Sequence, residues 1–148
     1  MSVQEIISSH LELAAQRPLT QEELATVNDS VPGPDAALGI RYTHISHGEV
    51  RSQIRVNSSH FQPWGVVNGG VYCVLAESAA SLGGVIAAGA PAVGVNNDTN
   101  FIKSVSEGVI EATATPIQLG GRTHLWRVDM HVEGTLVATS QVRLMILR

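Results

Sequence analysis

The residues of this sequence whose types and spacing suit chemistry lie in one stretch, from Gln62 to Ser81. Glu77 is the only charged residue between Asn57 and Asn97, in a run that is largely apolar or small. A carboxylate that is buried without a partner is costly, so such a residue is paired, neutralised or kept for its reactivity. Because no Lys or Arg lies within one helical turn of Glu77, we expect a carboxylate that attacks a substrate or activates water.

A second feature, the triplet Asn68-Gly69-Gly70, begins nine residues before Glu77. Glycines let a ligand approach the backbone closely, and the free N–H groups at a helix start favour a developing negative charge. A carboxylate and an amide cradle for an oxyanion are the minimum that acyl transfer to water requires. Along one helix the two features are about 13 Å apart, too far for both to touch one carbonyl. We therefore expect two copies of the helix to share each site, at a dimer interface.

Both features belong to the segment 68–89, which is expected to form a helix of about five turns with Asn68 as its N-cap. The helix is apolar or small on all faces apart from Glu77, which is typical of a helix buried on most sides. A membrane helix is the alternative, since residues 71–95 are long enough to span a bilayer. The central Glu77, the interrupting glycines and proline, and the amphipathic strands around it favour a core helix and no membrane partner.

Six segments that alternate with a period of two are expected to form an antiparallel sheet around this helix. They are 38–45, 49–56, 92–104, 107–119, 122–132 and 135–147. In the second of them, Val50, Ser52, Ile54 and Val56 share one face. Turn residues at hairpin spacing predict that the last four segments form a meander.

The N-terminal region is expected to form two short helices, because capping-box patterns begin at Ser2 and at Thr20, and the second helix is expected to end at about Val27. The segment 28–38 follows them with two prolines and a glycine, which makes it the best candidate boundary in the chain. We therefore expect a helical extension and linker at 1–36, followed by one α+β domain at 37–148.

The composition limits the class of protein. The chain has 148 residues, a formal net charge of −4, 44% hydrophobic and 15% charged residues. This balance is opposite to that of a disordered chain. A protein that binds nucleic acid needs a basic face, so the acidic net charge argues against a nucleic-acid partner. A single cysteine, Cys73, cannot form an internal disulfide, and the acidic N-terminus is unlike a signal peptide. A cytoplasmic location is therefore expected.

The run from Gln62 to Ser81, QPWGVVNGGVYCVLAESAAS, resembles the hotdog-fold acyl-CoA thioesterases of the phenylacetate-degradation (PaaI) and 4-hydroxybenzoyl-CoA types. Those enzymes carry His-Gly-Gly at the helix start and an acid nine residues after the His. This chain keeps the glycines and the acid at that spacing but has Asn68 in place of the His. The resemblance covers about residues 38–147. It implies an α+β hotdog fold, in which about six antiparallel strands wrap around a central helix.

The same resemblance implies the roles of four residues. Glu77 is the nucleophile or the general base, and the N–H of Gly69 polarises the thioester carbonyl. Gln62 positions the carbonyl or the water, and Ser81 orients the carboxylate of Glu77. The implied assembly is a homodimer, or a tetramer made of two dimers, in which the acid of one subunit faces the glycine loop of the other.

Three further residues are expected to bind substrate. Asn68 can still cap the helix in place of the family's His, so the cradle that it forms with Gly70 is expected to survive. Arg122 follows two glycines and could hold a phosphate of CoA, since a forked donor suits phosphate. The alternative for Arg122 is an ordinary solvated turn residue. No metal or cofactor is expected, because CoA is part of the substrate.

The expected activity is hydrolysis of an acyl-CoA with an aryl or medium-chain acyl group to the free acid and CoA. Two alternatives stay open. One is a hotdog dehydratase or hydratase acting on acyl-CoA or acyl carrier protein, suggested by His60-Phe61, although the interval to Glu77 is too long by about one helical turn. The other is a non-catalytic module that binds acyl-CoA, which would not need a lone buried carboxylate.

Overall fold

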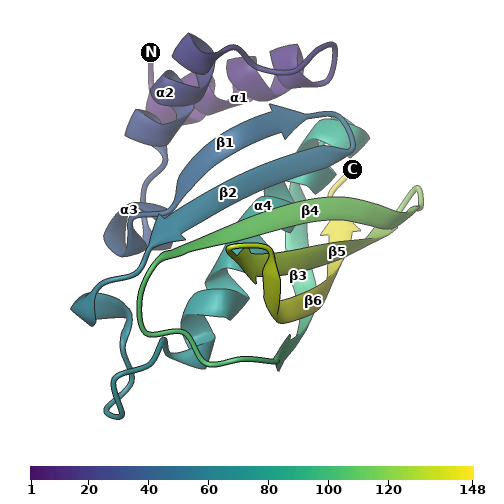
Figure 1. Ribbon diagram of the computed structural model, residues 1–148. Helices are drawn as coiled ribbons and strands as arrows, with labels where there is room; N and C mark the ends of the chain where they lie inside the picture. The colour runs from purple at the N-terminus through teal and green to yellow at the C-terminus, as the bar shows by residue number, and fades with distance from the viewer.

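The computed structural model describes all of residues 1–148. Three helices come first, α1 (Val3–Ala14), α2 (Gln21–Ser30) and α3 (Pro34–Leu38). The strands are β1 (Arg41–Ser46), β2 (Glu49–Arg55), β3 (Ala92–Phe101), β4 (Val109–Leu119), β5 (Thr123–Val132) and β6 (Thr135–Ile146), and the long helix α4 (Gly69–Ala88) separates β2 from β3. The strands form one antiparallel sheet whose face covers α4 (Figure 1). The predicted α+β class and the predicted central helix are both confirmed.

Helix α4 forms the centre of the core, as its composition predicts. The Oδ1 of Asn68 accepts the N–H of Gly70 at 2.8 Å, which confirms Asn68 as the N-cap. By length and composition alone α4 could cross a membrane, but half of its most apolar window is buried inside the protein. Leu75, Ala76 and Ala79 are fully buried and belong to the same hydrophobic cluster as the inner face of the sheet. The apolar character of α4 is therefore explained by its place in the core.

The order of the strands corrects one prediction. The sheet runs β1-β2-β4-β5-β6-β3, so β4, β5 and β6 form a meander, but β3 pairs with β6 at the edge. The predicted meander of all four late strands is therefore wrong for β3. The connection 102–108 is longer than a tight hairpin turn. It carries the chain across the sheet to β4, which pairs with β2 instead of β3.

The two edge strands of the sheet differ, because β1 is covered by another part of the chain and β3 is not. At β1, the side chain of Asn28 accepts the N–H of Tyr42 at 2.7 Å and donates to its carbonyl at 2.9 Å. Nearby, the N–H of Leu19 donates to the carbonyl of Ile45 at 3.0 Å. The N-terminal extension thus covers the edge of β1 (Figure 1), which prevents that edge from pairing with another chain. The outer edge of β3 has no such cover in the single chain.

The N-terminal helices agree with the sequence except in their bounds. Both predicted capping boxes are present, at Ser2 and at Thr20. Helix α2 continues three residues beyond its predicted end at Val27, and the predicted loop contains the short helix α3, which starts at Pro34. Proline suits the first helical position, because its missing N–H would be unpaired there.

A buried carboxylate joins this extension to the core. Asp35 of α3 is 7% exposed, and no Lys, Arg or His pairs with it. Its carboxylate accepts the hydroxyl of Tyr42 at 2.6 Å and the hydroxyl of Ser78 at 2.5 Å. Burial, followed by the charge of Asp35, raises the pKa of Tyr42 well above its usual value, which keeps this phenol a donor. Asp35 therefore holds together α3, β1 and α4.

Asp35→Ala is expected to lower the free energy of unfolding by about 2–4 kcal/mol, because it leaves the buried hydroxyl of Tyr42 and the half-buried hydroxyl of Ser78 without their acceptor. Urea unfolding measures the change. Asp29→Ala is the matched control, since Asp29 has a side chain that is 72% exposed and pairs only with Arg41. A loss at Asp35 no larger than the loss at Asp29 would show that the network does not stabilise the fold.

Candidate active site

The start of α4 presents a backbone N–H that is free to bind a ligand. Asn68 caps the N–H of Gly70, and its carbonyl accepts the N–H of Val71. The N–H of Gly69 has no hydrogen-bond partner, as expected at the first position of a helix. This group lies at the positive end of the helix dipole. It is therefore suited to stabilise the negative charge that develops on a thioester carbonyl oxygen.

The loop before α4 is fixed by His60, which is 2% exposed. The Nδ1 of His60 accepts the N–H of Asn57 at 3.0 Å, and its Nε2 donates to the carbonyl of Leu38 at 2.8 Å. The carbonyl of His60 accepts the N–H of Asn68 at 2.8 Å. These bonds hold the residue that caps α4, so His60 sets the position of the helix start.

A pocket of about 260 Å³ opens beside Gly69. It is lined by Gln62, Val66, Val67, Gly69, Tyr72, Phe101, Ile102, Lys103 and Ser104. The Oε1 of Gln62 accepts the N–H of Trp64 at 2.6 Å, which leaves the side-chain NH₂ of Gln62 free to donate. The ring of Phe101 lies against the Cα of Gly69, where a Cβ would come within 2.5 Å of it. Gly69 is therefore required for this close approach of the Phe101 ring.

Glu77 lies in a different hollow, of about 520 Å³, between α4 and the outer part of β3. The Nδ2 of Asn97 donates to its Oε2 at 3.3 Å and to the carbonyl of Cys73 at 3.0 Å. The sequence predicted a buried carboxylate, but Glu77 is only half-buried in the single chain. The reason is that β3, an edge strand, places the small Gly94 over it. The carboxylate is thus held in place yet open to solvent.

Gly94→Ala is expected to lower kcat about tenfold, because its Cβ would collide with the Oε1 of Glu77 and turn the carboxylate away. The backbone of Gly94 has an ordinary φ, and the colliding atom ends a flexible side chain, so the melting temperature should change little. Steady-state kinetics and thermal unfolding measure both effects. Gly89→Ala is not a suitable control for Gly94→Ala, because Gly89 has a positive φ of 61° and an alanine there would strain the backbone. An unchanged kcat would show that the reaction does not depend on the position of the Glu77 carboxylate beside Gly94.

The structure separates the other predicted site residues. Gln62, Gly69 and Asn68 lie together at the start of α4, and Gly70 follows them with its N–H capped. Ser81 forms no hydrogen bond with Glu77, whose carboxylate is bonded by Asn97 instead. The predicted contact with Ser81 is therefore absent from the single chain.

Arg122 lies on the β4–β5 hairpin, at the other end of α4. The guanidinium of Arg148 bridges the carbonyls of Gly121 and Ala88, both at 3.3 Å, so this hairpin lies beside the last turn of the helix. That turn is about 28 Å from Gly69 along the helix axis. Within one chain, Arg122 is therefore remote from the pocket at Gly69.

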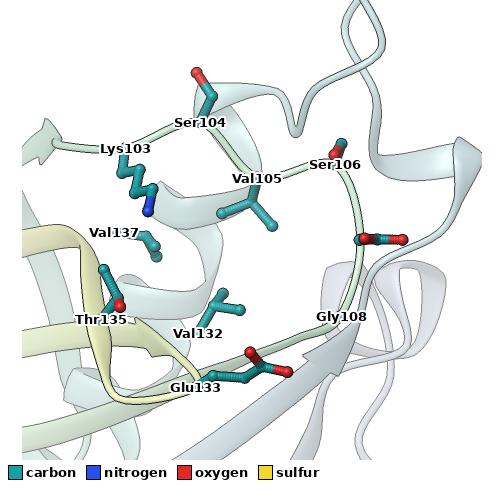
Figure 2. Close-up of a pocket in the computed structure, with 10 residues that line it drawn as sticks. Lys103, Ser104, Val105, Ser106, Gly108, Val132, Glu133, Thr135 and Val137 are labelled. Atoms are coloured by element: carbon teal, nitrogen blue, oxygen red, sulfur yellow. The ribbon is translucent and has the colours of Figure 1, made fainter.

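Three residues near the site have no counterpart among the predictions. Asn97 holds Glu77, Tyr72 lines the Gly69 pocket, and Lys103 is exposed between two pockets. Lys103 forms no ion pair, and Figure 2 shows its side chain directed into a hollow of about 540 Å³ beside the β5–β6 hairpin. Two of these residues could have been noticed in the sequence. Lys103 is the only lysine of the chain, and Asn97 places a side-chain amide within a predicted strand.

The arrangement supplies the parts that thioester hydrolysis needs: an N–H donor at a helix start, a side-chain amide and a carboxylate. No three His, Cys, Asp or Glu side chains are grouped so that they could hold a metal ion. The donor and the carboxylate lie eight residues apart on one helix, about 12 Å along its axis, and they face different hollows.

Comparison with known proteins agrees with this chemistry. The model of the thioesterase superfamily matches residues 65–139, which contain Gly69 and Glu77. A protein of Mycobacterium tuberculosis named "Putative esterase" is 39% identical over 81% of this chain and 89% of its own length. Its solved structure has a TM-score of 0.76, with 77% of this chain and 95% of that chain covered. The 1,4-dihydroxy-2-naphthoyl-CoA hydrolase of Escherichia coli is 32% identical over 74% of this chain and 83% of its own length.

A thioesterase of Staphylococcus aureus is also similar, with a TM-score of 0.72, 25% identity, and coverage of 77% of this chain and 98% of that chain. Two of its structures carry replacements of a glutamine and of a glutamate that stand fifteen positions apart, as Gln62 and Glu77 do here. The match to the superfamily model, the two relatives and the shared hotdog architecture lead to one conclusion. The chain belongs to the thioesterase superfamily and is a hotdog-fold enzyme that hydrolyses thioesters.

Proposed function

We propose that this enzyme hydrolyses an acyl-CoA with an aryl or medium-chain acyl group. The observation that carries the proposal is the free N–H of Gly69 in a pocket shared with Gln62, on the same helix as Glu77. The pocket of about 260 Å³ is smaller than the sites that hold whole drug-sized ligands, so it suits an acyl group with CoA outside it. The E. coli relative, named as a naphthoyl-CoA hydrolase, supports an aryl group.

In the proposed reaction the thioester carbonyl accepts a hydrogen bond from the N–H of Gly69, and the free NH₂ of Gln62 helps to position the carbonyl or the water. Glu77 then either removes a proton from water, which attacks the carbonyl carbon, or attacks that carbon itself to form an anhydride that water cleaves. In both cases the C–S bond breaks, CoA leaves as the thiol, and the acid is released. Asn97 holds the carboxylate in position for either step.

We propose further that each site is formed by two chains, and the spacing of Gly69 and Glu77 along α4 supports this proposal. Gly69 and Glu77 open into different hollows of one chain, so neither hollow is complete. The hollow of Glu77 borders β3, whose outer edge is unpaired and carries the exposed Val93 and Val95. An open apolar edge is a template for pairing with a second chain. A homodimer joined there would bring the Glu77 of one chain toward the Gly69 of the other, and a dimer of dimers stays a prediction.

Lys103 and Arg122 are the candidates for contact with the phosphates of CoA. Lys103 borders both the Gly69 pocket and the adjoining hollow, so it lies where the CoA part of the substrate would leave the pocket (Figure 2). Lys103→Ala is expected to raise KM several-fold with little change in kcat, the mark of a contact equally strong in the ground and transition states. Arg122→Ala is the comparison variant, and the sequence predicts the same effect there. A KM that is unchanged in both variants would show that neither side chain binds the phosphates.

The geometry of His60 argues against the dehydratase alternative. A dehydratase needs a histidine that exchanges a proton with substrate. Both ring nitrogens of His60 are engaged by the backbone, at Asn57 and at Leu38, and the residue is 2% exposed. His60 therefore serves to position the loop.

A panel of acyl-CoAs with a thiol reagent tests the proposal on the purified full chain. We expect release of CoA from benzoyl-CoA and its hydroxylated derivatives with higher kcat/KM than from short acetyl-CoA. Hydration of an enoyl-CoA without release of thiol would support the dehydratase instead. Saturable binding of acyl-CoA with neither reaction would support the non-catalytic module.

A further inference from the structure

A β-bulge in β3 decides which residues of this strand face Glu77. In a regular strand, residues three positions apart point to opposite faces of the sheet. Gly94 and Asn97 are three positions apart, yet both lie beside the carboxylate of Glu77. The reason is that the register with β6 shifts between Gly94 and Asn96, which adds a residue to β3 there. Bulges of this kind redirect side chains and are frequent beside active sites.

The side-chain amide of Asn97 is held at both its nitrogen and its oxygen. The Nδ2 donates to the carbonyl of Cys73 at 3.0 Å and to the Oε2 of Glu77 at 3.3 Å. The Oδ1 accepts the hydroxyl of Thr99 at 2.6 Å. Without that hydroxyl the oxygen of Asn97 would have no partner in the protein, and the amide could turn toward water and away from the carboxylate.

Thr99 is in turn fixed by the neighbouring strand. Thr99 and Ser140 stand opposite each other in the pairing of β3 with β6, and their hydroxyl oxygens are 2.7 Å apart. A hydroxyl has one proton, and because that of Thr99 goes to Asn97, Ser140 is the donor in this contact. Ser140 is 2% exposed, so the contact anchors Thr99 to the core. The hydrogen bonds thus run in one direction, from Ser140 through Thr99 to the amide that bonds Glu77.

We propose that Thr99 is a positioning residue for the reaction, which acts on Glu77 through the amide of Asn97. Thr99 lines neither the Gly69 pocket nor the hollow of Glu77, so it is not placed to touch the substrate. It fixes the direction of the NH₂ of Asn97, and this NH₂ holds the carboxylate for attack on the carbonyl carbon or for removal of a proton from water. The inference rests on the proposed function, in which Glu77 performs that step.

Thr99→Val tests the proposal in the full-length protein, because it removes the hydroxyl and keeps the shape of the side chain. The substrate is the acyl-CoA of the panel that the wild type hydrolyses fastest. We expect kcat to fall about 3- to 10-fold with KM unchanged, since a small displacement of a reacting group slows the chemical step without weakening binding. Thr99→Ser keeps the hydroxyl and should therefore keep kcat close to that of the wild type.

A double variant separates an effect through Asn97 from a general loss of structure. Asn97→Ala is expected to lower kcat at least as much as Thr99→Val does. Adding Thr99→Val to Asn97→Ala should cause no further loss, because the hydroxyl then has no amide to orient. If the two losses multiplied instead, Thr99 would act independently of Asn97, and the proposal would be overturned.

Thr139→Val is the matched control, because Thr139 precedes Ser140 on β6 and its hydroxyl donates to Asp129 at 2.7 Å, on the opposite face of the sheet. It should keep the kcat of the wild type, and urea unfolding of both variants shows what the loss of a hydroxyl does to stability alone. A kcat in Thr99→Val no lower than in Thr139→Val overturns this inference, while an inactive Glu77→Gln leaves the proposed function standing. A Glu77→Gln variant with full activity overturns the proposed function itself.

Discussion

Glu77→Gln is expected to lower kcat by about 10²- to 10⁴-fold, the usual contribution of a group that transfers a proton or activates a nucleophile. The amide is nearly the same size as the carboxylate, and its oxygen can still accept the bond from Asn97. It cannot, however, attack a carbonyl or remove a proton from water. Because Glu77 is half-buried and has no ion-pair partner, the midpoint of urea unfolding should stay close to that of the wild type.

A control variant separates loss of chemistry from loss of structure. Glu111→Gln changes another carboxylate to an amide, on β4 and outside the hollow of Glu77, and should retain full activity. If Glu77→Gln were inactive and also markedly less stable than the wild type, Glu77 would hold the fold together. The proposal that it acts on the substrate would then lose its main support.

Activity is expected to require two chains, and complementation between two inactive variants shows this most directly. Glu77→Gln lacks the carboxylate and Gln62→Ala lacks the amide, so each homodimer should be nearly inactive. In a mixed dimer with shared sites, one site combines both defects and the other has an intact carboxylate and an intact loop. Co-expression in equal amounts should therefore restore about a quarter of the wild-type activity.

If each site were contained in one chain, the mixed dimers would stay as inactive as their parents. Val93→Glu provides a second measurement, since it places like charges near each other when the β3 strands of two chains pair. Analytical ultracentrifugation should show a shift toward monomers, with activity falling in proportion to the loss of dimer. A monomer with full activity would contradict the shared site.

The sequence by itself determined the elements and the reactive groups, because both depend on short-range patterns. The capping boxes at Ser2 and Thr20 and the period-two segments each follow from interactions between residues a few positions apart. Helix α4 could be placed from its composition and from Asn68 for the same reason. The sequence spacing of Gly69 and Glu77, which is the spacing that the resembled thioesterases show, indicated thioester hydrolysis. The comparisons confirm the superfamily.

Only the tertiary structure decided which distant groups meet. The pairing of β3 with β6 depends on how the chain passes around α4, and no local pattern of residues specifies that path. This pairing places Gly94 and Asn97 over Glu77, so it also decides that the carboxylate is half-buried and bonded by an amide rather than by Ser81. The contact of Thr99 with Ser140 depends on the same pairing, because only one register places these two residues opposite each other.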